Sequence, residues 1–69
     1  MMGGDGMNEL RLRTVTGGVA VVTVPLGRMY QTMVVDRFGR EIKTLQATYA
    51  RQARENHEYC VSRYAHGNA

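Results

Sequence analysis

The stretch that decides the fold is "TVTGGVAVVTVP", residues 14–25. A Gly-Gly pair separates two runs rich in valine and threonine, and a two-residue glycine loop between such runs is typical of a β-hairpin with a primed turn. A two-residue loop also fixes the register of the strands that it joins. The expected pairs are Thr16 with Val19, Thr14 with Val21, and Leu12 with Thr23.

The first strand extends upstream, because "ELRLRTVT" (residues 9–16) alternates apolar and polar side chains with period two. With this register, one face of the hairpin would carry Leu10, Leu12, Val19 and Val21. The opposite face would carry Arg11, Arg13, Val22 and Val24. Pro25 cannot donate a ladder hydrogen bond, so it either ends the second strand or places it at a sheet edge.

A second hairpin is expected downstream, where "MYQTMVVD" (29–36) and "REIKTLQ" (40–46) have the composition of strands. Asp36 followed by Gly39 suits a type I turn closed by a left-handed glycine. In the third strand, one face would carry Tyr30, Thr32 and Val34. The other face would carry Met29, Met33 and Val35.

The pattern becomes helical near residue 48. Thr48 is a suitable N-cap, the helix would cover residues 49–65, and Gly67 would supply a stop. One stripe at helical spacing is suited to packing and comprises Tyr49, Ala53, Asn56, His57, Cys60 and Tyr64. The sequence therefore predicts an α+β fold, in which a four-stranded antiparallel sheet of two hairpins is followed by one C-terminal helix on one face. A simple meander is the default strand order.

The expected organisation is a single α+β domain over residues 9–66, with a disordered leader (1–8) and a frayed tail (67–69). The chain has 69 residues and a net charge of +3. A chain this short buries only about 60% of its unfolded surface, so its stability needs a supplement and a homodimer is favoured over a monomer. The lone Cys60 cannot form a disulfide within the chain, which favours a reducing, intracellular location. The start has no signal-peptide pattern, and no apolar run is long enough to span a bilayer.

The segment "ENHEYC" (55–60) gathers groups that can carry chemistry. His57 and Cys60 are three residues apart and therefore neighbours on the helix. A Cys–His nucleophile needs a lowered thiol pKa and an open cleft, and a helix face packed on a sheet offers neither. A metal would need further ligands, and only His66 is near. The interpretation is a core thiol beside a histidine at the rim of the core, with no enzyme activity, metal or cofactor.

Basic residues raise the possibility of a nucleic-acid surface. Arg11 and Arg13 would share a sheet face, and three further arginines lie in or beside turns. Together with an aromatic residue they could bind a nucleic-acid backbone and stack a base. The candidate residues are Arg11, Arg13, Arg28, Tyr30, Arg37 and Arg40. The alternative is that these arginines supply solubility and protect strand edges.

Both faces of the predicted sheet carry large apolar side chains, although one helix can cover only one face. An uncovered apolar patch usually marks an interface. Either a second copy of the chain or a partner protein would then bind there.

Three segments resemble a family of small proteins from tailed phages and prophages: "VVTVPL" (21–26), "YQTMVV" (30–35) and "ATYARQARENH" (47–57). That family typically reads Val-Ser-Thr-Val-x-Leu, then Phe/Tyr-Glu-Thr-Met-Val-Phe, then Tyr-Ser-Thr-x-x-Glu-Ala-x-x-Gly-His. The matching positions are Thr23, Val24, Leu26, Tyr30, Thr32, Met33, Val34, Thr48, Ala53 and His57. The chain departs from the pattern at Gln31, Gln52 and Asn56, and only "GR" (27–28) stands where the family has a longer loop.

The resemblance implies a phage or prophage origin and the cytoplasm of a bacterial host, and it implies no reaction. The first hypothesis is therefore a non-enzymatic phage-type accessory protein that binds a host or phage protein, with inhibition of host machinery or defence as one purpose of that binding. The second is a small nucleic-acid-binding protein that uses the basic surface above. The third is a sponge for a small nucleotide signal, because arginines near turns can hold phosphates.

Overall fold

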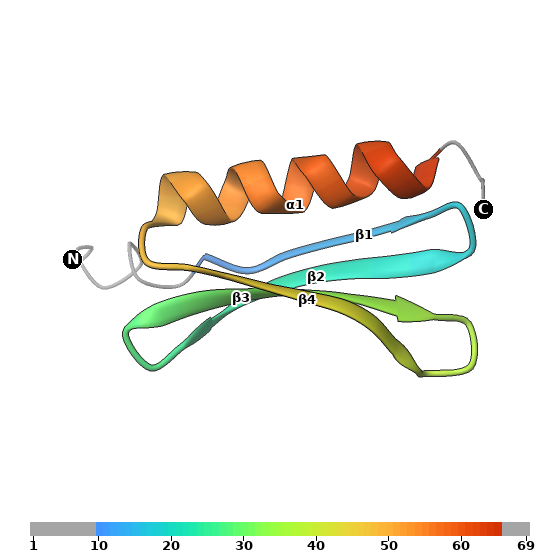
Figure 1. Ribbon diagram of the computed structural model, residues 1–69, viewed down its shortest axis with the longest axis horizontal. Coiled ribbons are helices and arrows are strands. Elements are labelled where there is room, and N and C mark those ends of the chain that lie inside the picture. The colour runs from blue at the N-terminus through green and yellow to red at the C-terminus, as the bar shows by residue number, and fades with distance from the viewer. Residues whose placement is uncertain (1–9, 66–69) are drawn as a thin grey trace, which may run out of the picture.

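The computed structural model describes residues 10–65, which form one antiparallel sheet and one helix. The strands are β1 (Leu12–Thr16), β2 (Val19–Leu26), β3 (Met29–Asp36) and β4 (Glu41–Ala47), and the helix is α1 (Ala50–Ala65). The strand order is β1-β2-β3-β4, and α1 lies along one face of the sheet (Figure 1). The predicted β-β-β-β-α fold and the meander order are confirmed. The predicted leader (1–8) and tail (67–69) lie outside the described residues.

The first hairpin has the predicted turn and register. Gly17 and Gly18 have φ angles of 57° and 83°, the left-handed values that a primed two-residue turn requires. All three expected cross-strand pairs are present, and Thr16 lies opposite Val19 at the turn. In a two-residue hairpin these flanking residues exchange both backbone bonds, so every second residue of β1 directs its N–H and C=O groups away from β2.

Pro25 lies within β2, a central strand, and does not end it. The alternation of the ladder directs the backbone of Pro25 toward the β1 side of β2. However, β1 begins at Leu12, which pairs with Thr23, so no β1 residue lies opposite Pro25. The missing N–H therefore costs no ladder bond, and Pro25 occupies a local sheet edge, as its chemistry requires.

The second hairpin closes through Asp36, as predicted. The N–H of Gly39 donates to the carbonyl oxygen of Asp36 at 3.0 Å, and Gly39 has a φ of 85°. The Asp36 carboxylate accepts two further bonds, from the N–H groups of Phe38 (2.8 Å) and Arg40 (2.9 Å). Beyond this turn a β-bulge lies opposite Val34 and Val35 in β4.

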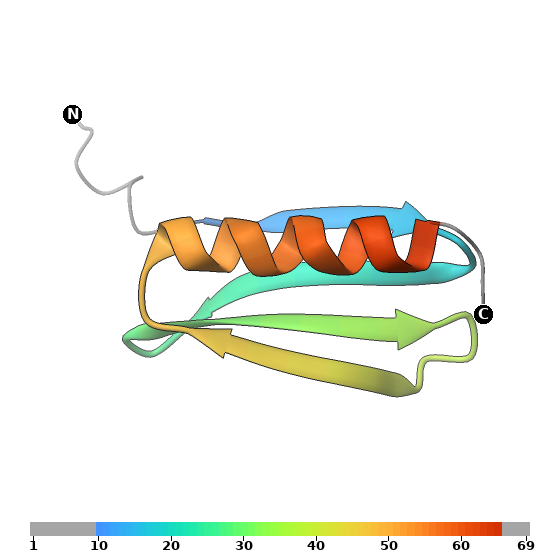
Figure 2. The same cartoon turned by 45° about the horizontal axis from the view of Figure 1, so that its top comes forward.

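The core lies between α1 and the two central strands. Its buried centre consists of Val19, Val21, Val34 and Cys60, and Leu45, Val61 and Tyr64 pack against it. On the helix, Ala53, His57 and Cys60 are buried, which confirms the centre of the predicted stripe. Figure 2 shows α1 running along the strands, in the direction opposite to β4, from which the chain enters it.

The start of the helix differs from the prediction. The helix begins at Ala50, and the carbonyl of Tyr49 accepts its first backbone bond, from Ala53 at 3.0 Å. Tyr49 is therefore the N-cap residue, in place of Thr48. The Tyr49 side chain is 72% exposed and does not join the packing stripe. The reason is that an N-cap residue lies outside helical geometry, so the helical period does not extend to its side chain.

Candidate functional site

His57 is the central polar residue of the core. It reaches from α1 to the sheet and is only 5% exposed. Its Nδ1 atom lies 2.8 Å from Thr23 Oγ1 on β2, and its Nε2 atom lies 3.0 Å from Thr14 Oγ1 on β1. Thr23 Oγ1 is in turn 2.7 Å from Thr32 Oγ1 on β3. These four side chains form a hydroxyl–histidine network that ties the helix to three strands.

Two proton arrangements satisfy the hydroxyl–histidine network. In one, Thr23 donates to Nδ1 and accepts from Thr32, while Nε2–H donates to Thr14. In the other, Nδ1–H donates to Thr23, which donates to Thr32, while Thr14 donates to Nε2. Each leaves every ring nitrogen paired, as buried polar atoms require. In residues 10–65, no buried side-chain nitrogen or oxygen lacks a partner.

Burial sets the charge of this network. Desolvation lowers the pKa of His57 below its ordinary value, and the nearby Glu58 carboxylate opposes this shift. One turn further along the helix, burial also raises the pKa of the Cys60 thiol, against the smaller opposing effect of Lys43. His57 is therefore held neutral and Cys60 is held as the thiol, so neither is activated for nucleophilic chemistry.

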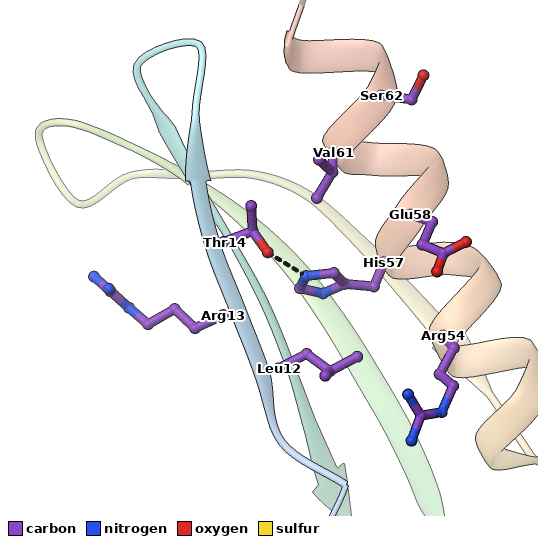
Figure 3. A pocket seen from close by; sticks show the side chains of 8 residues that line it. All are labelled: Leu12, Arg13, Thr14, Arg54, His57, Glu58, Val61 and Ser62. Atoms are coloured by element: carbon purple, nitrogen blue, oxygen red, sulfur yellow. Dashed lines mark hydrogen bonds between the residues drawn. The ribbon is translucent and has the colours of Figure 1, made fainter.

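A groove of about 380 Å³ lies beside the network, between β1 and α1. Its strand wall consists of Leu12, Arg13 and Thr14. Its helix wall is one flank of α1 that includes Arg54, Glu58 and Val61. Figure 3 shows the side chains of Leu12 and Thr14 pointing toward the helix, whereas the Arg13 side chain points away from it. The main chain of Arg13 therefore supplies that part of the groove wall. We call this feature the β1–α1 groove.

The Thr14–His57 pair resembles a hydroxyl nucleophile beside a base, but the rest of such a site is missing from the described chain. A catalytic histidine is normally oriented by a carboxylate, whereas the second nitrogen of His57 bonds the Thr23 hydroxyl. A lowered pKa also makes the imidazole a weaker base. Across residues 10–65, no three histidine, cysteine or acidic side chains gather as metal ligands. The geometry favours a structural role for the network.

The six candidate binding residues do not form one surface. The side chain of Arg13 lies on the sheet face turned away from α1, and Arg11 lies just before β1, which begins at Leu12. Arg28 lies in the β2–β3 turn, at the opposite end of the sheet from Arg37 and Arg40 in the β3–β4 turn. The pairing of Tyr30 with Ala47 and Pro25 places Tyr30 on the helix side of the sheet. The basic and aromatic groups are thus spread over both faces and both ends.

The open face of the sheet, meaning the face turned away from α1, is apolar at its centre. The register and the alternation of side chains place Val22, Val24, Met33 and Val35 there. These four side chains are half-buried. Around them lie Val15 (64% exposed), Leu26 (53%) and Met29 (38%). The predicted division of the strands into two faces that both carry apolar side chains is therefore confirmed.

Comparison with protein-family models, curated proteins and solved structures found no match to this chain. Among residues 10–65, no helix has the length and the apolar character needed to cross a membrane.

The threonines of the network were not singled out by the sequence reasoning. His57 was placed at the rim of the core, whereas it is buried and bonded at both nitrogens. The turn between the second and third strands could have predicted the threonine pair. A two-residue loop at Gly27 and Arg28 pairs Leu26 with Met29, and the same register places Thr23 opposite Thr32. Two threonines paired on the helix side of a sheet favour a polar partner, and His57, like Asn56, is a polar residue of the packing stripe.

Proposed function

We propose that this chain is a non-enzymatic accessory protein of phage type, which binds a host or phage protein inside the bacterial cell and inhibits it. The observation that carries the proposal is the apolar centre of the open face. A two-layer domain with one helix buries one sheet face, and the second face of such a sheet is normally polar where it meets water. Here that face carries Val22, Val24, Met33 and Val35.

The continuity of this apolar surface also supports a protein partner. The half-buried centre continues without a break into Leu26 and Met29, which are exposed at the β2–β3 end of the sheet. Contiguous apolar surface of this kind on a small domain is typical of interaction sites. A hydrophobic centre with a polar rim is the usual anatomy of a protein–protein interface, and here Gln31, Thr44 and Gln46 supply polar side chains on the same face.

The phage setting of the proposal rests on the family resemblance. Thr23, Thr32 and His57 come from the three separate segments that match the family pattern. They meet in the hydroxyl–histidine network together with Thr14, which lies outside the matching segments. The resemblance itself assigns no biochemical role, so the phage setting is part of the proposal.

Two other occupants of the open face compete with a partner protein. A second copy of the chain could cover it, giving a homodimer. Nucleic acid could bind through Arg11 and Arg13, but the other arginines of that hypothesis lie at the two ends of the sheet. A nucleotide sponge has even less support, since those turn arginines do not converge on one pocket. The dispersed charge and the apolar centre favour a protein.

A tagged pull-down from bacterial lysate, with and without nuclease, tests the proposal. It compares the wild-type chain with Met33→Glu, which places a charge at the centre of the open face. Tyr59→Glu is the matched control, because Tyr59 is 52% exposed on the helix, away from the sheet. We expect a specific protein to be retained by the wild type and by Tyr59→Glu after nuclease, and to be lost from Met33→Glu.

Three results would contradict the proposal. Retention that disappears with nuclease would indicate nucleic acid. A wild type that sediments as a dimer, and a Met33→Glu variant that sediments as a monomer, would show that a second copy covers the face. Equal retention of one protein by both variants would place its binding site elsewhere. Circular dichroism of each variant checks that the fold is intact.

A further inference from the structure

The free edge of β1 and the adjacent helix flank form a second surface, separate from the open face. In the described part of the chain, β1 pairs only with β2, so its other edge carries unpaired backbone groups. The two-residue turn sets which groups these are: Thr14 and Thr16 direct their N–H and C=O groups to β2, and Arg13 and Val15 direct theirs outward. An exposed row of this kind is a template for a further strand.

The β1–α1 groove runs along this same edge. Arg13, one of the two outward-directed residues, is among the residues that line the groove, and its side chain points away from the helix (Figure 3). On the helix, residues 54, 58, 61 and 62 line the facing wall and share one flank by their spacing. An unpaired strand edge beside a groove of about 380 Å³ thus offers both backbone hydrogen bonds and a pocket for side chains. Peptide recognition by strand addition needs these two elements together.

We propose that the edge of β1 binds an extended peptide of a partner protein, as a fifth strand with an apolar–acidic–apolar core. The alternation of side chains sets this pattern. Peptide residues opposite Leu12 and Thr14 would face the helix and enter the groove, whose walls there include Leu12 and Val61. The residue between them would lie opposite Arg13, on the open side of the sheet, where the guanidinium group favours an acidic side chain.

Charge also selects against a second copy of the chain at this edge. If β1 strands from two copies paired antiparallel about Arg13, the two Arg13 side chains would lie directly opposite each other. Like charges directly opposite each other destabilise a sheet. The groove adds Arg54 on its helix wall, with Glu58 one turn further along. An acidic peptide from another protein fits this arrangement better than the cationic chain itself.

A phage-displayed library of random nine-residue peptides, selected on the full-length chain, tests the inference. We expect enriched peptides to share an apolar–acidic–apolar core. Binding should fall at least tenfold for Val15→Pro, which removes one outward N–H but no bond to β2. The matched control is Val15→Ala, which truncates the same exposed side chain, keeps that N–H and should bind as the wild type does.

A charge-reversal pair on α1 tests the groove itself. Arg54→Glu leaves the groove wall with two carboxylates and no guanidinium group on the helix, which should repel the acidic peptides and weaken their binding at least fivefold, whereas Arg51→Glu, which lies outside the groove on the same helix, should not. In the bound state, the amide protons of Arg13 and Val15 should exchange with solvent at least tenfold more slowly, because they become hydrogen-bonded.

No enrichment, enriched peptides without the alternating core, or equal binding to Val15→Pro and Val15→Ala would each overturn the inference. Unchanged exchange at Arg13 and Val15 in the bound state would do the same. Failure here does not overturn the proposal for the open face, because Met33→Glu tests the centre of that face, whereas the pair Val15→Pro and Val15→Ala tests the outward N–H of a residue at its rim. The two proposals therefore succeed or fail separately.

Discussion

Gly17, in the first hairpin turn, lies directly against the main chain of Tyr64 near the end of α1. A Cβ atom on Gly17 would lie 1.8 Å from the Tyr64 carbonyl oxygen and 2.9 Å from the carbonyl carbon. Both distances are far below van der Waals contact, and both involve backbone atoms that cannot rotate away. The last turn of the helix therefore rests on a position of the hairpin where only glycine fits.

Replacement of Gly17 by alanine should accordingly be far more destabilising than the same change at Gly27. Gly27 also has a positive φ, of 65°, but a Cβ there would meet no atom within 4 Å. Gly27→Ala should cost about 1 kcal/mol, which is the backbone penalty alone. Gly17→Ala adds the collision with Tyr64 and should cost about 2 kcal/mol more. Urea unfolding measures both changes, and equal costs would show that the helix end does not rest on this turn.

Loss of the Thr23 hydroxyl should destabilise the fold through the network. Thr23→Val keeps the shape of the side chain but removes the atom that bonds both His57 and Thr32. Each buried group left without its partner costs about 1–3 kcal/mol. We expect a loss of about 2 kcal/mol in the free energy of unfolding, because the surroundings relax in part. Thr44→Val, at an exposed position of β4, is the control and should change this free energy by less than about 0.5 kcal/mol.

The stability of the protein should fall in mildly acidic solution because of His57. Its pKa in the folded protein is below the value of about 6.5 in an unfolded chain. Well above pH 6.5, by about one unit or more, neither state binds a proton there, so the contribution of neutral His57 is fully present. As the pH falls below about 6.5, the unfolded chain binds a proton that the folded protein does not, and the free energy of unfolding decreases until the folded pKa is reached.

A His57→Gln variant isolates this effect. The slope due to His57 can reach at most about 1.4 kcal/mol per pH unit, and it should disappear in the variant, although the variant is less stable at every pH. The measurement is denaturant unfolding of both proteins between about pH 7.5 and pH 5, because histidine changes its charge in this range. Identical slopes for both proteins would show that His57 is not held neutral by burial.

Cys60 should be protected from thiol reagents in the folded protein. It is fully buried, and its pKa is raised by that burial, so little reactive thiolate is present or accessible. Reaction with an iodoacetamide reagent should be at least about a hundredfold slower than in urea, because it requires transient opening of the core. Rapid labelling of the native protein would place Cys60 at the surface and contradict the described packing.

The hairpin registers explain why so much of the fold follows from the sequence. A two-glycine loop permits one register, in which Thr16 pairs with Val19. That register determines which face each β1 and β2 side chain occupies. The helix phase likewise follows from the spacing of Ala53, His57 and Cys60. These are local rules, and each acts within one hairpin or one helix.

The parts that were missed depend on contacts between elements. The bond from His57 to Thr14 joins residues 43 positions apart, and no local pattern specifies the distance from the helix to β1. The positions of the arginines also depend on contacts between elements. The sequence places them in turns, but the separation of Arg28 from Arg37 at opposite ends of the sheet depends on strand order. Tyr49 was misplaced because the exact N-cap residue is set by how the chain leaves β4.

The most direct test of the account is photo-crosslinking in bacterial cells. A benzophenone amino acid at position 33 would report on the centre of the open face, and one at position 59 would report on the outer side of α1. We expect position 33 to give one discrete adduct with a different protein, and position 59 to give none. An adduct of two copies of the chain from position 33, or the same adduct from both positions, would contradict the claim that this face binds a partner protein.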